Sequence, residues 1–168
     1  HLTRENEFYN VDFEVRRGEI LGFFGLMGAG RTEVMGTLFG LRKADKGSVT
    51  MKGQKLGTVK KAITSGMAYI TEDRKISGLN LIASVKDNIS LAYMDMITRA
   101  KCLIDFKKEK KISDSLIEKL RIKCTNRDTL AGTLSGGNQQ KIVIAKWFMG
   151  DPDLLIMDEP TRGIDIGA

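Results

Sequence analysis

Residues 134–141 read LSGGNQQK and residues 154–165 read LLIMDEPTRGID, and these two runs decide the fold of the chain. The first run is a glycine-rich turn that opens a helical segment. We expect the Ser135 hydroxyl and the backbone N–H groups of Gly136 and Gly137 to form an anion site at the helix N-terminus. The pattern therefore indicates a place where a phosphate or another anion binds.

The second run is a short apolar segment that ends in two acidic residues, Asp158 and Glu159. Such a segment is typical of a buried parallel strand, and α/β sheets bind their ligands at the carboxyl ends of these strands. We therefore expect an α/β sheet whose ligand-binding edge carries both carboxylates.

The composition is that of one soluble globular domain, with 168 residues, 42% of them apolar and 29% charged. The net charge of +6 is compatible with nucleic acid, anionic lipid or a nucleotide as ligand. Many lysines lie between Lys101 and Lys123, and we interpret them as a solvated helix face because no aromatic residues alternate with them. Nucleic acid is therefore not an expected partner.

Two further features limit the class of protein. Cys102 and Cys124 have no metal-ligand spacing, so reduced thiols in a cytosolic protein are expected. No apolar run approaches the roughly 20 residues that a membrane helix needs, so a role at a membrane would come through a partner.

The chain stops at Ala168, where a doubly wound sheet should continue, and we expect a C-terminally truncated fragment of a longer protein.

A second glycine-rich turn follows the apolar run Ile20–Phe24, which predicts a buried strand, and precedes a helix that should end near Phe39. Strand, glycine-rich turn and helix are the context of a phosphate-binding P-loop, in which Thr32 is placed to bind Mg²⁺ through its hydroxyl. The turn comprises Gly25, Leu26, Met27, Gly28, Ala29, Gly30, Arg31 and Thr32.

Arg31 stands where the P-loop pattern has lysine. Arginine keeps the positive charge, but its guanidinium is larger and forked, so the exchange is not conservative at a tight site. We predict a weakened phosphate site. The alternative is that Arg31 still cradles phosphate adequately.

Shorter patterns fill the rest of the chain. Residues 11–15 alternate apolar and acidic side chains and predict a half-exposed strand. Thr58 is the predicted N-cap of a short helix that Gly66 ends, and Glu72 follows the apolar strand Met67–Ile70. Other predicted elements are a strand at 48–51 and helices at 85–94, 106–120 and 136–149. The helix at 106–120 carries an apolar stripe of Ile112, Leu116, Ile117 and Leu120. The helix at 136–149 is expected to bury a face with Ile142, Ala145 and Phe148.

Together, LSGGNQQK and LLIMDEPTRGID resemble the signature and Walker B motifs of ABC-type ATPases. The resemblance covers nearly the whole chain and implies an α/β fold: a P-loop NTPase core with a mostly parallel sheet and an inserted helical subdomain. It implies that residues 1–80 are the first part of the core and residues 81–133 the helical subdomain. Residues 134–168 then carry the signature helix, the Walker B strand and the D-loop back to the core.

Four runs narrow the resemblance to the second ATPase domain of bacterial monosaccharide importers of the ribose and galactose type, in which two ATPase domains are fused. These runs are GLMGAGRTE, YITEDRK, LSGGNQQK and DEPTRGID. The implied partners are the first ATPase domain or a second copy, membrane permease subunits and, indirectly, a periplasmic or extracellular sugar-binding protein. The implied location is peripheral, at the cytoplasmic face of the bacterial membrane.

The resemblance also implies the site, with ATP and Mg²⁺ as cofactors. The P-loop holds this domain's own nucleotide, with Thr32 and Asp158 at the metal, and Glu159 stands where the family has its general base. Glu72 occupies the Q-loop position, where the family has glutamine, and Asp165 belongs to the D-loop. The signature residues serve ATP held by the partner domain, and they are Leu134, Ser135, Gly136, Gly137 and Gln139.

The implied function is that of an ATPase subunit that couples ATP binding and hydrolysis to monosaccharide uptake. The isolated chain is expected to be inactive or very weak. Two alternatives remain open. One is a soluble ABC ATPase without a transporter. The other is a non-hydrolysing regulatory nucleotide-binding module, which Arg31 favours and the intact Asp158 and Glu159 disfavour.

Overall fold

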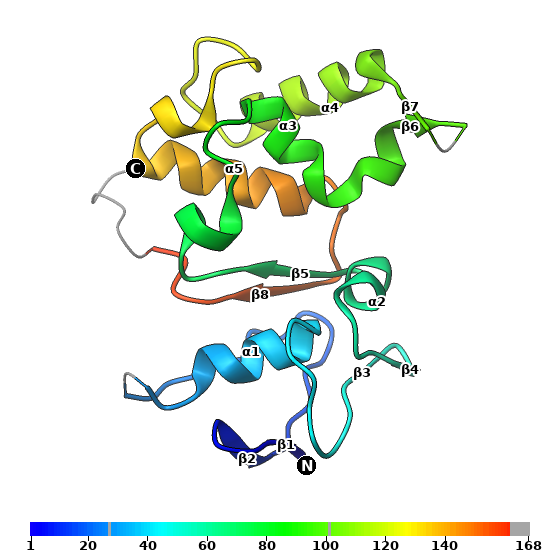
Figure 1. Ribbon diagram of the computed structural model, residues 1–168, viewed down its shortest axis with the longest axis vertical. Helices are drawn as coiled ribbons and strands as arrows, with labels where there is room; N and C mark the ends of the chain where they lie inside the picture. Colours follow the sequence, from blue (N-terminus) through cyan, green and yellow to red (C-terminus); the bar gives the residue numbers. More distant parts are fainter. Residues whose placement is uncertain (27, 101, 162–168) are drawn as a thin grey trace. The chain divides into compact units, whose positions relative to one another are not determined.

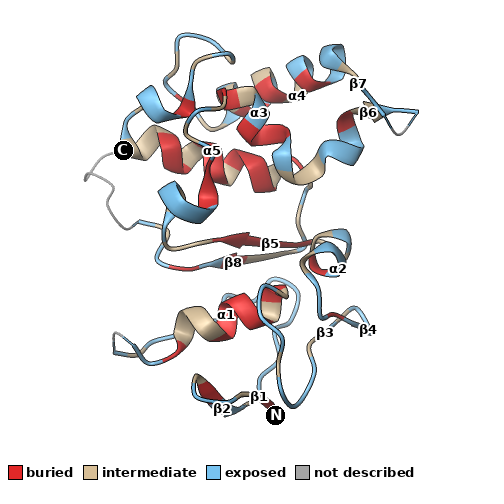
Figure 2. Cartoon of the chain, in the orientation of Figure 1, coloured by how far each residue is buried: buried red, intermediate tan, exposed pale blue. Residues whose placement is uncertain are grey.

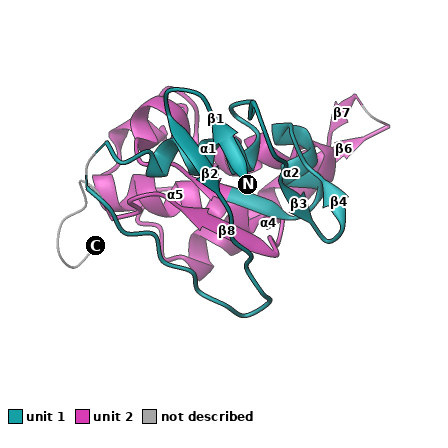
Figure 3. Cartoon of the chain, turned by 90° about the horizontal axis from the view of Figure 1, so that it is seen from below, with its two compact units in different colours: residues 1–68 teal, residues 69–168 magenta. Residues whose placement is uncertain are grey.

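The computed structural model describes residues 1–26, 28–100 and 102–161. The chain divides into two compact units, His1–Ala68 and Tyr69–Ala168, which Figure 3 shows in different colours. Within the described ranges, no helix is long and apolar enough to cross a membrane. The predicted subdomain boundaries near residues 80 and 133 stay predictions.

The first unit contains two small antiparallel hairpins and two helices among its described residues (Figure 1). Leu2 pairs with Val11 in the first hairpin. Thr50 pairs with Lys55 in the second. In chain order the elements are β1 (Leu2–Arg4), β2 (Phe8–Val11), α1 (Arg31–Phe39), β3 (Thr50–Met51), β4 (Gln54–Lys55) and α2 (Val59–Thr64).

Both helices of the first unit confirm the sequence pattern. α1 begins at Arg31, directly after the glycine-rich turn, and ends at Phe39, where Gly40 takes the left-handed φ of 86° that terminates the helix. α2 begins after Thr58, whose side chain accepts a hydrogen bond from the Lys61 N–H. Thr58 is therefore the N-cap, as predicted.

The predicted buried strand at Ile20–Phe24 is wrong for this structure. Described residues 12–26 contain no strand, and the Ile20 and Phe24 side chains are 98% and 102% exposed. The predicted strand at residues 11–15 is wrong as well, because β2 ends at Val11. A parallel strand needs neighbours on its edges and layers on its faces, whereas the described strands of the first unit pair as local hairpins. Among the described residues, no strand pairs with the apolar run.

The second unit combines a group of helices with the strand pair β5–β8, and a small hairpin, β6–β7, joins two of the helices (Figure 1). Its elements are β5 (Met67–Ile70), which spans the boundary between the units, η1 (Arg74–Gly78), α3 (Val85–Ser90), η2 (Leu91–Ile97), β6 (Thr98–Arg99), β7 (Leu103–Ile104), α4 (Phe106–Lys119), η3 (Ala131–Thr133), α5 (Gly136–Phe148) and β8 (Leu154–Met157).

β5 and β8 were each predicted as strands, and in the structure they form a parallel pair. Their carboxyl ends meet, because the Asp158 N–H donates to the Ile70 carbonyl oxygen at 2.9 Å, and both strands run the same way in Figure 1. All residues of β5 are buried. In β8, Ile156 is buried but Met157 is 57% exposed. The expectation of a buried strand therefore holds only in part for β8, whose one neighbour among the described residues is β5.

The helices α3, α4 and α5 pack against one another. Figure 2 shows their buried residues in red. Val85 and Ile89 of α3 and Ile142 of α5 are fully buried. A capping box starts α3, since Ser84 and Asp87 each accept a hydrogen bond from the other's backbone N–H. Burial of aliphatic side chains removes apolar surface from water and stabilises this group of helices.

The predicted apolar stripe of α4 needs a correction. Within that stripe Leu116 is buried, but the remaining buried side chains of α4 are Glu109 and Ser113. The Ser90 hydroxyl of α3 donates to Glu109 Oε1 at 2.8 Å, so a hydrogen bond satisfies a carboxylate where the pattern predicted only apolar contact. In α5, Ile142 and Ala145 are buried as predicted.

Candidate functional site

The described part of the glycine-rich turn leads into α1, which begins at Arg31. The Ala29 N–H donates to the Leu26 carbonyl oxygen at 3.1 Å. Gly30 takes a left-handed φ of 82°, and a Cβ atom there would lie 3.0 Å from the Glu7 carbonyl oxygen. Glycine is therefore required at this position by both the backbone angle and the space.

The helix α1 starts without a side-chain cap, because its N-cap is Gly30. The first N–H groups of a helix have no partner within it, and with the helix dipole they favour an anion. Arg31 and Thr32 lie half-buried in this first turn. The turn thus has the donors that a phosphate site needs, while Met27, predicted in the same turn, lies outside the described residues.

The run LSGGNQQK opens α5, and its N-cap is Ser135. The Ser135 side chain is exposed and makes no capping bond to the backbone. Gly136 and Gly137 form the first turn, where backbone N–H groups lack partners within the helix. The donors that the sequence predicted for an anion therefore lie together at one helix end.

The buried Gln139 side chain stabilises this turn through hydrogen bonds to the backbone that precedes α5, including Leu134. The Gln139 side chain is 5% exposed. Its Nε2 atom donates to the Leu134 carbonyl oxygen at 3.1 Å and to the Ala131 carbonyl oxygen at 3.3 Å. In this structure Gln139 thus holds the residues that precede α5 in place.

Asp158 and Glu159 differ sharply in their surroundings. The Asp158 side chain is 7% exposed. Its Oδ2 atom accepts a hydrogen bond from the Tyr69 hydroxyl at 3.2 Å. Glu159 is exposed and has a φ of 44°, in the left-handed region that residues other than glycine seldom adopt. Residues held in sparsely populated backbone conformations are frequent at functional sites. The Asp158 carboxylate is thus buried and hydrogen-bonded, whereas Glu159 is an exposed residue.

Glu72 lies half-buried just after β5, and the π-helical turn η1 follows it. Asp73 caps η1 with its carboxylate. The last residue of η1, Gly78, accepts a hydrogen bond from Lys146 Nζ at 2.7 Å. Since Lys146 belongs to α5, this bond ties the segment after Glu72 to the helix that carries the signature turn.

The sequence analysis missed Lys146, Tyr69 and Asn138, whose side chains donate hydrogen bonds to Gly78, Asp158 and Ser135, respectively. Burial lowers the pKa of Lys146 from 10.5 to about 8. One sequence signal was available for Lys146, because it lies four residues after the buried Ile142 and so on the inner face of α5. Tyr69 carried a weaker signal: a phenol in an apolar strand needs a hydrogen-bond partner.

The second unit brings Glu72, Asp158 and Glu159 to the carboxyl ends of β5 and β8. The glycine-rich turn belongs to the first unit, and Asp165 lies outside the described residues. The Thr32 hydroxyl and the Asp158 carboxylate are hard oxygen ligands of the type that Mg²⁺ takes, so the residue types fit this metal. Within the described part of the chain, no three His, Cys, Asp or Glu side chains gather into a metal cluster.

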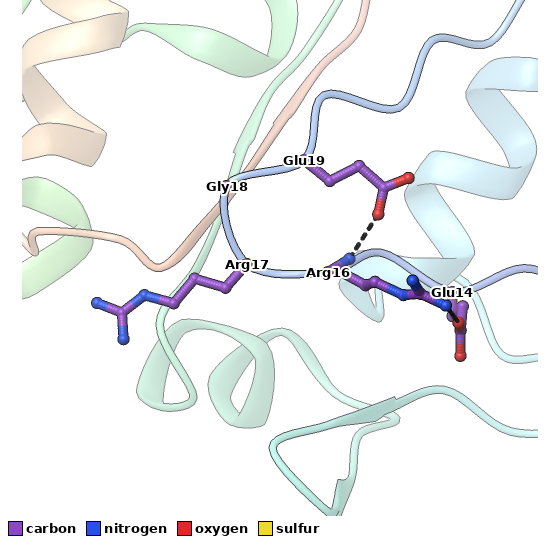
Figure 4. Close-up of a pocket in the computed structure, with 5 residues that line it drawn as sticks. All are labelled: Glu14, Arg16, Arg17, Gly18 and Glu19. Atoms are coloured by element: carbon purple, nitrogen blue, oxygen red, sulfur yellow. Dashed lines mark hydrogen bonds and ion pairs between the residues drawn. The ribbon is translucent and has the colours of Figure 1, made fainter.

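Figure 4 shows a pocket of about 550 Å³ in the loop that precedes the glycine-rich turn. Both glutamates of its lining bind Arg16: the Arg16 guanidinium donates to Glu14 Oε1 at 2.9 Å, and the Arg16 backbone N–H donates to Glu19 Oε2 at 2.8 Å. Exposed pairs of this kind contribute little stability. The lining consists of Glu14, Arg16, Arg17, Gly18 and Glu19, none of which is a predicted site residue.

Comparison with known proteins identifies relatives along the whole chain. A family model described as ABC transporter matches residues 8–162. All of the chain aligns at 50% identity with the "Ribose import ATP-binding protein RbsA" of Halalkalibacterium halodurans, of which it covers 34%. A Rhizobium etli protein, named for ribose, galactose and methyl galactoside import, is also 50% identical over all of the chain, which covers 32% of it. The chain therefore spans about a third of the length of these relatives.

Two solved structures share the fold. The ATP-binding cassette MJ0796, in a dimeric post-hydrolysis state bound to ADP and Pi, matches with a TM-score of 0.76 at 19% identity, over 93% of this chain and 67% of that one. The ABC transporter cassette MJ1267 matches with a TM-score of 0.74 at 21% identity, over 98% and 68% of the two chains. At these identities the likeness establishes the fold alone, an α/β P-loop NTPase cassette with a parallel sheet.

Proposed function

Because this chain belongs to the ABC transporter family of ATPases, we propose that it is part of the ATP-binding subunit of a bacterial sugar importer, and of its second ATPase domain. The observation that carries the proposal is the uncapped signature turn at the start of α5, followed by β8, which ends in Asp158 and Glu159. Relatives that are 50% identical and named for ribose import support it. The subunit would bind permease subunits at the cytoplasmic face of the membrane and work with a sugar-binding protein.

The proposed task of the signature turn is to bind ATP that the P-loop of the opposite ATPase domain holds. The Ser135 hydroxyl and the N–H groups of Gly136 and Gly137 would donate hydrogen bonds to phosphate oxygens, and the dipole of α5 would add to their attraction. Donors that are already in place when charge develops on the transferred phosphoryl group lower the barrier without reorganisation.

The proposed task of the glycine-rich turn, residues 25–32, is to wrap the phosphates of this domain's own ATP. Thr32 and Asp158 would hold Mg²⁺, which neutralises charge on the β- and γ-phosphate oxygens when bound. Glu159 would accept a proton from water as the water oxygen attacks the γ-phosphorus and ADP leaves with the electrons of the broken bond. The exposure of Glu159 gives water access to its carboxylate.

Arg31 makes the two ATP sites of the proposed assembly unequal. Its bulky guanidinium, in the first turn of α1, replaces the compact ammonium of the P-loop lysine. The signature face of this domain would then be competent, whereas its own P-loop would bind ATP weakly.

A calorimetric titration of Mg²⁺–ATP into the chain and its Arg31→Lys variant tests this asymmetry. Tighter binding by the variant, by about tenfold or more, would support a P-loop weakened by arginine. Equal affinities would show that the arginine is tolerated. Arg42→Lys is the matched control, because Arg42 lies in the same unit and pairs with Glu7 at 2.8 Å outside the turn.

A second candidate function is a non-hydrolysing regulatory nucleotide-binding module, which Arg31 favours. Single-turnover ATP hydrolysis by the full-length subunit separates this module from the ATPase, because a regulatory module would bind ATP without cleaving it.

Copurification of the full-length subunit with a membrane permease tests the importer assignment. If the subunit hydrolyses ATP but copurifies with no permease, it would instead be a soluble ABC ATPase.

A further inference from the structure

Asn138, the third residue of α5, contacts the signature serine with its side chain. The Asn138 Nδ2 atom donates to Ser135 Oγ at 2.9 Å. On the other side of the amide, Asn138 Oδ1 accepts a hydrogen bond from the Lys123 N–H at 2.7 Å. The amide therefore bridges the loop after α4 and the hydroxyl at the start of α5.

The Lys123 N–H determines which way the amide points. A backbone N–H can only donate, so the amide atom that faces it must be the oxygen, and the NH₂ group must face Ser135. The loop itself is held, because the neighbouring Ile122 is 5% exposed and its N–H donates to the Ile117 carbonyl oxygen at 2.9 Å. The direction of the Asn138–Ser135 bond is therefore fixed.

This direction decides what the Ser135 hydroxyl can do. A hydroxyl has one proton to donate and two positions at which it accepts. Because Asn138 occupies an accepting position, the hydroxyl proton points elsewhere. Ser135 is exposed, so the proton is presented to solvent or to a bound anion.

Ser84, at the start of α3, shows the other arrangement that an N-cap serine can take. Its Oγ accepts a hydrogen bond from the Asp87 N–H at 3.2 Å, and its hydroxyl proton is donated to Asp87 Oδ2. The hydroxyl proton of Ser84 is thus engaged by Asp87, three positions later, and is not available to another acceptor. At the start of α5 the corresponding residue is the amide Asn138, which leaves the proton of Ser135 available.

We propose that Asn138 is a positioning residue that keeps the Ser135 hydroxyl as a hydrogen-bond donor to a phosphate oxygen of ATP. The inference rests on the proposed function, because it assigns a task to a neighbour of the signature serine. With the proton of Ser135 directed outward, the hydroxyl and the N–H groups of Gly136 and Gly137 can all donate to one anion. A residue that accepted at position 138 would draw the proton inward and remove one of these donors.

The test is a double-mutant cycle of Asn138→Ala and Ser135→Ala, measured as ATP hydrolysis by the full-length subunit with its transporter. Asn138→Ala should lower kcat/KM about tenfold when Ser135 is present, as expected for one hydrogen bond, and less than about twofold when Ser135 is replaced. Equal losses in both backgrounds would overturn the inference, because Asn138 would then act only by holding Lys123. A wild-type subunit that hydrolyses no ATP would overturn the proposed function, and this inference with it.

Asn138→Asp provides a second, nearly isosteric test. It keeps an oxygen for the Lys123 N–H, but it places a carboxylate oxygen, which accepts, opposite Ser135. Activity relative to wild type should fall at neutral pH and recover as the pH approaches about 4, where the new carboxyl takes up a proton. An Asn138→Asp variant that hydrolyses ATP like the wild type at neutral pH, where the new carboxyl is ionised, would overturn the inference.

Asn126→Asp is the matched control for added charge. Asn126 lies in the loop between α4 and α5, and its Oδ1 atom accepts a hydrogen bond from the Asp128 N–H at 2.8 Å, which the new carboxylate would keep. This variant should hydrolyse ATP like the wild type at every pH. The comparison therefore separates the loss of a donor at Ser135 from a general effect of one more negative charge.

Discussion

The Tyr69 hydroxyl donates a hydrogen bond to Asp158 Oδ2 at 3.2 Å, and both side chains are buried, with 3% and 7% exposure. A buried carboxylate is costly unless its oxygens have hydrogen-bond partners. The bond therefore helps β8 to end in an acidic residue beside β5. It also orients the side chain that we propose as a ligand of Mg²⁺.

Replacing Tyr69 by phenylalanine should destabilise the fold. Tyr69→Phe removes the donor to Asp158 and keeps the ring, so the free energy of unfolding should fall by roughly 1.5 to 3 kcal/mol, the range for hydrogen bonds to charged groups. Urea denaturation of both proteins measures it. Tyr9→Phe is the control, because Tyr9 is 64% exposed and should change stability by less than about 0.5 kcal/mol. Equal effects of the two substitutions would contradict the buried bond.

Lys146 should make the stability of the fold rise with pH in the alkaline range. Burial lowers its pKa from 10.5 to about 8, so between these values the unfolded chain holds more protons than the folded chain. Stability therefore increases from about pH 8 to pH 10, and the cost of burying the charge is fully present below pH 8. The neutral amine keeps an N–H for the bond to the Gly78 carbonyl oxygen.

Comparison with Lys146→Met isolates this contribution. The difference in unfolding free energy, wild type minus variant, should rise on the order of 1 kcal/mol per pH unit between about pH 8 and pH 10. Urea midpoints measured at several pH values give this difference directly. Parallel curves for the two proteins would mean that the ammonium of Lys146 is not desolvated in the folded state.

Gly150 should not tolerate a side chain. A Cβ atom at Gly150 would overlap the Tyr93 ring, which packs edge-on against Trp147 with ring centroids 6.2 Å apart. Gly150→Ala should therefore lower the free energy of unfolding by about 1 to 3 kcal/mol, the cost of overpacking. In a Tyr93→Ala background the same change should cost less than about 0.5 kcal/mol. Thermal unfolding of the four proteins completes the cycle, and a cost independent of Tyr93 would contradict the overlap.

Features with local signals could be predicted from the sequence. The helices α1 and α5 begin at the glycine-rich turns that predicted them, and Thr58 caps α2. A turn, a cap and an apolar period act over a few residues, so neighbouring side chains suffice to specify them. The same motifs indicated the α/β class and the carboxyl end of β8 as the place of Asp158.

Features that depend on distant partners could not be predicted. The apolar run Ile20–Phe24 has the composition of a buried strand, but a strand is completed by neighbours that its own residues do not specify. Tyr69 and Asp158 are 89 positions apart, and Lys146 and Gly78 are 68 apart. No periodicity connects such pairs. The parts of the site that hold its acidic and signature residues in place therefore became visible only in the structure.

The signature turn and the glycine-rich turn should respond unequally to substitution. In Ser135→Arg, a large cation at the start of α5 would cover the N–H groups of Gly136 and Gly137 and oppose the helix dipole. ATP hydrolysis by the full-length subunit should fall by more than about a hundredfold, the scale for losing preorganised donors. Arg31→Ala should lower ATP hydrolysis less than about tenfold, because the proposed P-loop is already weak.

Ser115→Arg, at an exposed position of α4, is the control for an added arginine and should leave hydrolysis unchanged. Equal losses for Ser135→Arg and Arg31→Ala would show that both ATP sites turn over alike, and the proposed asymmetry would fail.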